Sequence, residues 1–151
     1  DTYSQKMGLN FSDTEGKQKS VEMGCYGIGV GRLLAAVIEA NSSEKELVLD
    51  KNISPFQVYL VNLNSDNTEV KEVSNSVYSD LINSDYDVLF DDRDEGPGVK
   101  FSDYELSGVP VRIVISKRSL ENSEVEILER GKEDFKMVKI KDINKELSKL
   151  I

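Results

Sequence analysis

The residues best suited to chemistry lie in one glycine-rich stretch, Val21 to Ala40 (VEMGCYGIGVGRLLAAVIEA). Glycines stand at positions 24, 27, 29 and 31, and Arg32 follows the last of them. Glycine lets the backbone approach a bulky ligand because it has no Cβ, and a helix N-terminus beside an arginine favours an anion. The residue types and their spacing therefore predict a contact with a nucleotide or a phosphate.

Two familiar nucleotide motifs are excluded, and one structural alternative stays open. Gly27, Gly29 and Gly31 read as GxGxG, with Arg32 where the dinucleotide-binding GxGxxG places its last glycine. No Gly-Lys-Ser/Thr follows, so the stretch is not a P-loop. Glycines also let a helix pack closely against a sheet, and their spacing alone does not separate this role from ligand binding.

A second polar stretch holds the carboxylates of Asp91, Asp92, Asp94 and Glu95 and runs into Gly96-Pro97-Gly98. Clustered carboxylates can bind magnesium or calcium. Their spacing does not fit the EF-hand loop, however, and carboxylates at the end of a strand are usually solvated or paired. We therefore expect no metal site in this chain.

Composition narrows the classes of function. The chain has 151 residues, no histidine and one cysteine, which excludes His-based catalytic dyads and triads and an internal disulfide. A net charge of −9 argues against broad binding of nucleic acids but permits local, base-specific contacts. No apolar run approaches the roughly 20 residues of a membrane-spanning helix. The N-terminal DTYSQKMG lacks an initiator methionine and a signal-peptide pattern, so we expect a piece of a longer protein.

The first part of the chain is expected to form a β-hairpin and a helix. Apolar and polar residues alternate on both sides of a polar turn at 13–17. The second strand is expected to continue through 21–29 into the glycine turn. An apolar pattern at i, i+3, i+4 and i+7 predicts a helix over 30–40, and a polar stretch at 42–53 is the expected linker.

The remainder of the sequence predicts an α/β domain. Apolar strands alternate with amphipathic helices, which implies parallel pairing with right-handed crossovers, and a final hairpin adds antiparallel edge strands. Phe101 and Leu106 are expected to point inward from one helix, Gly108 to close it, and Asp142 to cap the last helix. The expected fold is a mixed, mainly parallel five-stranded sheet flanked by helices. The strands are expected at 56–63, 86–90, 111–115, 124–129 and 135–140, and the helices at 67–83, 99–107 and after residue 142.

The glycine stretch resembles a known signature. MGCYGIGVGR followed by an apolar helix is similar to the third signature motif of class II aminoacyl-tRNA synthetases, in the version found in prolyl-tRNA synthetases of the bacterial type. Three later segments, SPFQVYLV, VLFDDRDEGPGVKFSDYELSGVPVRIVIS and SEVEILER, resemble the C-terminal anticodon-binding domain of the same family. Two departures stand out: Gly31 replaces the usual serine, and Leu49-Asp50 replaces the usual Trp-Pro in the linker.

The resemblance implies that the glycine stretch belongs to an ATP site. Arg32 would lie against the adenine ring and reach the phosphates, since a guanidinium can both stack and carry charge. Gly27, Gly29 and Gly31 would give the adenosine room.

The resemblance also implies that Cys25 and Gly24 line a small proline pocket. Without it, Cys25 reads as a buried core cysteine. No residue of this chain receives a catalytic role as acid, base or nucleophile. The Mg²⁺ of the parent enzyme would be bound by residues upstream of this chain.

The loop and helix that begin at residue 91 would face the anticodon. Arg93 and Lys100 would donate to guanine O6 and N7 or to phosphates, the alternative being solvated or salt-bridged charges. Phe101 could stack on an unpaired base or pack in the core. Glu105 could accept from a guanine amino group or pair with a basic neighbour. Arg130, on the final hairpin, is expected to be an exposed strand charge.

Taken as a whole, the resemblance implies a C-terminal fragment of a prolyl-tRNA synthetase. Residues 1–41 would end the class II catalytic domain as a hairpin and helix, 42–53 would be a linker, and 54–151 the anticodon-binding domain. The parent enzyme would be a cytoplasmic homodimer that ligates proline to its tRNA with ATP, and the fragment alone would be inactive. The alternative is a non-catalytic, synthetase-like module for RNA binding or assembly.

Overall fold

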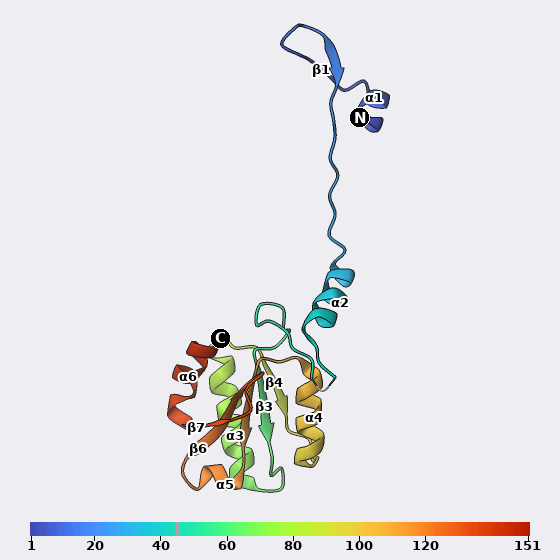
Figure 1. Ribbon diagram of the computed structural model, residues 1–151. Coiled ribbons are helices and arrows are strands. Elements are labelled where there is room, and N and C mark those ends of the chain that lie inside the picture. The colour runs from blue at the N-terminus through green and yellow to red at the C-terminus, as the bar shows by residue number, and fades with distance from the viewer. Residues whose placement is uncertain (45) are drawn as a thin grey trace. The chain divides into compact units, whose positions relative to one another are not determined.

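The computed structural model describes residues 1–44 and 46–151. Contacts divide the chain into two compact units, Asp1–Leu33 and Leu34–Ile151 (Figure 1). The smaller unit holds most of the glycine stretch, and the larger one holds the predicted α/β domain.

The first unit contains the predicted β-hairpin. Strands β1 (Asn10–Ser12) and β2 (Gln18–Ser20) pair in antiparallel fashion. The turn between them contains Gly16 with a φ of 79°, the left-handed conformation that glycine adopts at little cost. A short helix, α1 (Thr2–Met7), precedes the hairpin and was not predicted, because six residues are too few to show a helical apolar pattern.

The strand predicted over residues 21–29 is wrong. The backbone of these residues forms no regular structure. Among the described residues, the sheet of this unit consists of β1 and β2, and neither strand extends into 21–29. A strand is stable only where a neighbour satisfies its backbone hydrogen bonds, and an apolar run alone does not supply that neighbour. Helix α2 (Val30–Asn41) follows as predicted, and none of its residues is buried.

The second unit is built on a five-stranded sheet in the order β4-β3-β5-β6-β7. The central strand β3 pairs in parallel with β4 and β5, and β6 pairs in antiparallel fashion with β5 and β7, so four of the five strands point the same way. This confirms the predicted mixed, mainly parallel sheet. The strands are β3 (Val58–Asn62), β4 (Val88–Asp91), β5 (Val111–Ile115), β6 (Glu124–Glu129) and β7 (Lys136–Lys139).

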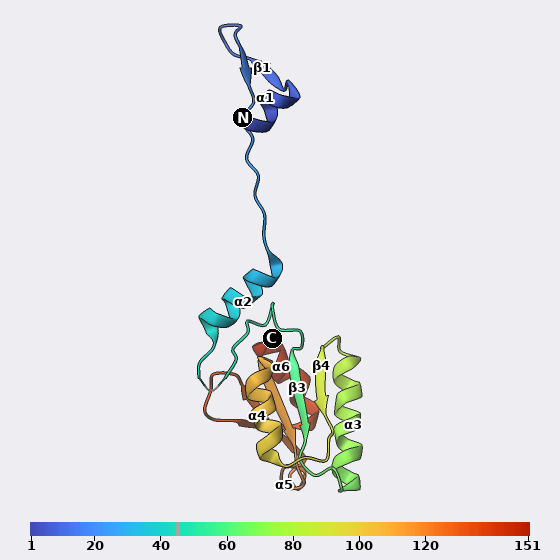
Figure 2. The ribbon, with the colours of Figure 1, turned by 90° about the vertical axis from the view of Figure 1, so that its right-hand side faces the viewer.

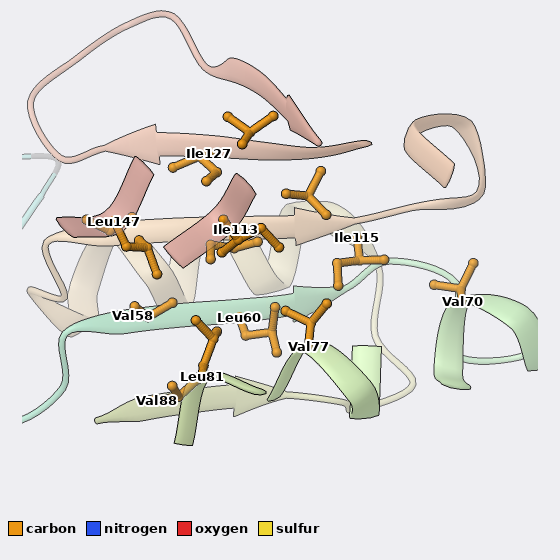
Figure 3. Packing of buried hydrophobic residues seen from close by; sticks show 14 residues of the cluster. Val58, Leu60, Val70, Val77, Leu81, Val88, Ile113, Ile115, Ile127 and Leu147 are labelled. Carbon is orange, nitrogen blue, oxygen red and sulfur yellow. The ribbon is translucent and has the colours of Figure 1, made fainter. Parts of the chain in front are cut away.

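Helices cover both faces of this sheet (Figure 1, Figure 2). On one face, α3 (Thr68–Ile82) and α6 (Ile143–Leu150) bury an aliphatic core against every strand (Figure 3). On the other face, α4 (Pro97–Ser107) packs on a smaller cluster that includes Tyr59, Val61 and Tyr104. Alternate residues of β3 belong to the two clusters, as the period of two along a strand requires.

Two short helical segments complete the second unit. Helix α5 (Lys117–Leu120) was not predicted, although Ser116 and Ser119 form a capping box at its start. A 3-10 turn, η1 (Ile140–Asp142), leads directly into α6. Asp142 occupies the position before α6 but its side chain makes no capping hydrogen bond, so its predicted capping role is wrong.

Helix α4 presents a different face to the sheet from the one expected. Phe101 is half-buried against the smaller cluster, but Leu106 is 69% exposed, so its predicted inward orientation is wrong. The buried partner of this helix is Tyr104, three residues after Phe101 and so on the same side. Lys100, four residues before Tyr104, also points inward.

The C-terminal end of α4 is tied down from two directions. Gly108 closes the helix with a φ of 73°, as predicted. The guanidinium of Arg130 donates to the carbonyl oxygens of Tyr104, Glu105 and Val109. Because the side chain of Arg130 is only 3% exposed, the expectation of an exposed strand charge is wrong. A cation at a helix C-terminus satisfies carbonyls that lack an intrahelical partner.

Residues before the sheet pack on the same helix end. The N–H of Leu47 donates to the carbonyl of Glu105 over 2.9 Å, and Leu49 is buried beside Gly108. A Cβ at Gly108 would stand 2.8 Å from side-chain carbons of Leu49. Segment 46–49 and the end of α4 therefore form one close-packed contact.

We predict that Gly108→Ala lowers the free energy of unfolding by about 2 kcal/mol, because alanine is strained at positive φ and its methyl group collides with Leu49. The measurement is the urea midpoint. The matched control is Gly98→Ala in the same helix, where an added Cβ meets nothing within 4 Å. That variant is expected to be as stable as the parent chain or up to about 1 kcal/mol more stable. Equal midpoints for the two variants would contradict the prediction.

Candidate functional site

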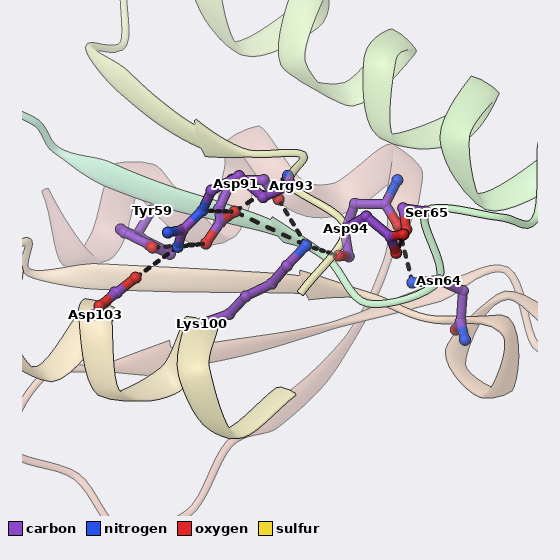
Figure 4. Close-up of polar contacts among 9 residues, drawn as sticks. Tyr59, Asn64, Ser65, Asp91, Arg93, Asp94, Lys100 and Asp103 are labelled. Carbon is purple, nitrogen blue, oxygen red and sulfur yellow. Dashed lines mark hydrogen bonds and ion pairs between the residues drawn. The ribbon is translucent and has the colours of Figure 1, made fainter. Parts of the chain in front are cut away.

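The candidate site lies where the carboxyl ends of β3 and β4 meet the start of α4. Asn62 and Asp91 are the last residues of the two neighbouring strands, and the loop 92–96 leads from β4 into α4. Figure 4 shows side chains from both strands, the loop and the helix converging on Asp91. Ligands of open parallel sheets commonly bind at this edge.

Asp91 is a buried carboxylate with several partners. Its residue is 5% exposed. The carboxylate accepts from the hydroxyl of Tyr59 over 3.0 Å and from Nε and Nη2 of Arg93 over 2.9 and 2.7 Å. The Arg93 guanidinium holds the pKa of Asp91 below its ordinary value, whereas burial, followed by the bond to Asp91, raises the pKa of Tyr59 to about 12. Asp91 is therefore a fixed negative charge.

Arg93 is held between two carboxylates and still reaches the surface. Its Nη2 also contacts Asp103 on α4 over 2.6 Å, and its side chain is 49% exposed. Within the described residues these bonds use Nε and Nη2 and leave Nη1 without a protein partner. A guanidinium held in this way presents a donor edge in a defined orientation.

Lys100 is inside the protein rather than at its surface. It is 1% exposed, and its Nζ donates to the carbonyl of Asn62 over 2.6 Å. The same Nζ lies 3.4 Å from the carbonyl oxygen of Asp91 and 3.8 Å from its Oδ1. The structure does not present Lys100 as the surface donor that the sequence suggested, because its side chain points into the sheet from the inner face of α4.

A second cation stands on the other flank of α4. The guanidinium carbon of Arg112, on β5, lies 4.2 Å from the ring centre of Phe101 and 5.0 Å from that of Tyr104. Burial lowers its pKa, and within the described residues its side chain has no hydrogen-bond or ion-pair partner. The sequence analysis missed Arg112; the signal for it was a single arginine inside the apolar strand VRIVI.

The remaining predicted residues of this region lie on the surface. Glu105 is exposed, while its backbone carbonyl is used by Leu47 and Arg130. Asp92, Asp94 and Glu95 are also exposed. The part of the chain that the structure describes contains no cluster of three or more Cys, Asp or Glu side chains arranged to hold a metal ion.

The glycine stretch is a separate candidate site in the first unit. Among the described residues, a Cβ at Gly27 would meet nothing within 4 Å. A Cβ at Gly29 would stand 3.1 Å from Nε of Arg32, so the bare backbone there lets the arginine fold back over the turn. Cys25 is a free, exposed thiol and not a core cysteine.

The other two predicted residues of this stretch have different surroundings. A Cβ at Gly31 would meet nothing within 4 Å. At Gly24 a Cβ would stand 2.9 Å from the ring of Tyr26. Gly31 and Arg32 belong to the first turn of α2, where unpaired backbone N–H groups favour an anion.

Comparison with known proteins places the second unit in a family. Residues 57–150 match the family model described as "Anticodon binding domain". The chain belongs to the anticodon binding domain family. In this anticodon binding domain, Arg93 is half-exposed beside the carboxyl ends of β3 and β4, and Arg112 lies against the ring of the partly buried Phe101.

The similarity extends beyond the matched residues. The chain is 45% identical over 136 residues to "Proline--tRNA ligase" of Endomicrobium trichonymphae, covering 89% of this chain and 24% of that protein. It is 44% identical over 140 residues to the protein of the same name from Dehalococcoides mccartyi strain BAV1, covering 93% and 25%. The chain thus spans about a quarter of the length of these curated relatives.

A solved structure has the same fold. The prolyl-tRNA synthetase of Cryptosporidium parvum, crystallised with L-proline and AMP, matches with a TM-score of 0.75 at 23% identity, over 98% of this chain and 32% of that one. In the described residues of the present chain, no helix combines the length and the apolar character needed to cross a membrane.

We predict that Asp91→Asn lowers the free energy of unfolding at pH 7 by about 3 kcal/mol, because it leaves the buried ammonium group of Lys100 without its counter-charge. The folded-state pKa of Asp91 lies below its ordinary value of 3.8, so its contribution is present above that pH and is lost as the pH falls through the folded-state pKa. The difference in free energy of unfolding between the parent chain and Asp91→Asn should therefore become smaller as the pH is lowered. Urea unfolding between pH 7 and pH 2 measures it.

The control for this prediction is Asp92→Asn, which makes the same chemical change at the neighbouring, exposed position. It should change stability by less than about 0.5 kcal/mol at any pH. A constant gap between parent and Asp91→Asn across the pH range would show that Asp91 stabilises the fold by something other than its charge.

Proposed function

We propose that this chain is part of a proline–tRNA ligase and that its second unit reads the anticodon of proline tRNA. Residues 54–151 form the anticodon-binding domain, 42–53 the linker, and 1–41 the end of the catalytic domain. The similarity to proline–tRNA ligases over 136 residues carries the proposal, since an alignment of that length cannot fit within the 57–150 of the family model and must include the glycine stretch.

Arg93 is the principal donor to the anticodon. A guanidinium can donate two hydrogen bonds to O6 and N7 of guanine. The anticodon of proline tRNA contains two adjacent guanines. Arg93 is half-exposed and oriented by Asp91 and Asp103, so it meets a base with little further loss of side-chain freedom.

The other flank of α4 supplies stacking and further polar groups. Phe101 and Arg112 together present an aromatic ring and a guanidinium to which an unpaired base can stack. Glu105, exposed on the same helix, can accept from the guanine amino group. These contacts are local, which suits a chain whose net charge of −9 gives it no general attraction to RNA.

The first unit contributes to the ATP and proline site of the ligase. Arg32 clamps the adenine ring, with Gly27, Gly29 and Gly31 leaving the backbone open to the adenosine. Cys25 and Gly24 line the proline pocket. This part of the proposal is supported by the arginine folded over Gly29 and by the exposed thiol of Cys25. The magnesium, the homodimer and the cytoplasmic location of the parent enzyme stay predictions from the family resemblance.

We predict that Arg93→Ala weakens binding of a proline tRNA anticodon stem-loop about ten- to hundredfold, the range for loss of one bidentate base contact. Fluorescence anisotropy with a labelled stem-loop measures the dissociation constant. Lys145→Ala removes the same charge from an exposed position on α6, which covers the opposite face of the sheet, and should leave the affinity within about twofold. An equal loss of affinity in both variants would mean that Arg93 contributes only its charge and makes no specific contact with a base.

A further prediction concerns catalysis. The chain alone should support no proline-dependent exchange of pyrophosphate into ATP, because the alignment covers only about a quarter of the length of the ligases. The radiolabel exchange assay is the measurement, with a full-length proline–tRNA ligase as positive control. Robust exchange by the purified chain would overturn the assignment of residues 1–41 as part of a larger site.

A further inference from the structure

We propose that Lys100 is a positioning residue: it fixes Asp91, and through Asp91 the guanidinium of Arg93, without contacting RNA itself. This inference rests on the proposed reading of the anticodon by Arg93 and adds the internal support of that contact. In this role the buried lysine supports another side chain, whereas a lysine at the surface would donate hydrogen bonds to a phosphate or a base.

The surroundings of Lys100 are those of a side chain that holds parts of the protein interior together. An ammonium group has three N–H donors, and three oxygen atoms surround Nζ. These are the carbonyl of Asn62 at 2.6 Å, the carbonyl of Asp91 at 3.4 Å and Oδ1 of Asp91 at 3.8 Å. With 1% of the residue exposed, the ammonium group is out of reach of a ligand at the surface.

The position of these oxygens explains what Lys100 holds together. Asn62 ends β3 and Asp91 ends β4, so one ammonium group joins the carboxyl ends of two parallel strands. Beyond those ends the sheet hydrogen bonds stop, and the direction of the loop that carries Arg93 depends on side-chain contacts. Lys100 supplies such a contact from the first turns of α4.

The contact between Lys100 and Asp91 also fixes the orientation of Arg93. Two of its nitrogen atoms bond the carboxylate of Asp91, and the same carboxylate lies beside the Lys100 ammonium. Without Lys100, the carboxylate of Asp91 would keep Tyr59 and Arg93 as its partners among the described residues and would be buried with less compensation. Asp91 would then be free to turn toward solvent, and Arg93 would turn with it.

A double-mutant cycle tests this chain of contacts. Parent, Lys100→Met, Arg93→Ala and the double variant are titrated with the proline tRNA anticodon stem-loop. Lys100→Met is expected to weaken binding about fivefold to fiftyfold in the parent background and to cause no further loss once Arg93 is absent, because Lys100 acts only through it. Losses that multiply in the double variant would show an independent contact and overturn the proposal.

The conservative variant separates the two roles even if the methionine variant does not fold. A lysine that contacts phosphate can be replaced by arginine with binding retained, whereas a larger guanidinium does not fit a buried site built for one nitrogen. Lys100→Arg is therefore expected to weaken binding, and only while Arg93 is present. Retained affinity in Lys100→Arg would overturn the proposal.

The unmodified chain offers an independent readout. Acylation of lysine amines followed by mass spectrometry should leave Lys100 unmodified in both the free and the RNA-bound chain, while exposed Lys145 reacts in both. Reaction of Lys100 in the free chain, with protection by RNA, would mean direct contact. If Arg93→Ala binds like the parent, the proposed anticodon contact fails; if it binds weakly but Lys100→Met binds like the parent, only the positioning role fails.

Discussion

The buried carboxylate of Asp91 is the constraint on which the arrangement at the carboxyl ends of β3 and β4 depends. A carboxylate at 5% exposure is costly unless hydrogen bonds and opposite charges compensate it. Tyr59 from β3, Arg93 from the loop and Lys100 from α4 each supply part of that compensation. Because these partners come from different elements, stabilising one charge also fixes the strand, the loop and the helix relative to one another.

Helix α4 connects this cluster to the opposite end of the sheet. Its first turns carry Lys100 and Asp103, and its last turn accepts hydrogen bonds from Arg130 and from the backbone of Leu47. Arg130 also lies 4.0 Å from the ring centre of Tyr104, so the same side chain satisfies the helix end and packs on its buried face. A helix of 11 residues held at both ends is a firm support for the side chains it presents between them.

The pattern of apolar residues predicted the sheet, α3, α4 and the final hairpin, because apolar side chains recur in these elements with the spacing of a strand or a helix. The same pattern could not predict which individual charged side chains are buried or what they contact. Lys100 and Arg130 look like surface residues in sequence, and both are buried because their partners stand 38 and 25 positions away. The strand expected over 21–29 failed for a related reason, since backbone pairing depends on a neighbour that no local pattern encodes. Arg112 was missed because its aromatic partners lie on another element.

The proposed recognition of RNA by so acidic a chain depends on the placement of its charges rather than on its net charge. Asp91 and Asp103 carry two negative charges beside Arg93, and Lys100 returns one positive charge to the same cluster, so the four side chains sum to zero. The carboxylates that contact Arg93 are thus balanced within the cluster, while the exposed Asp92, Asp94 and Glu95 of the same loop add negative charge nearby. Coulomb forces beyond about 10 Å are screened by salt, so the distant acidic surface weakens this contact little. What the cluster provides is orientation, and orientation is what distinguishes one base edge from another.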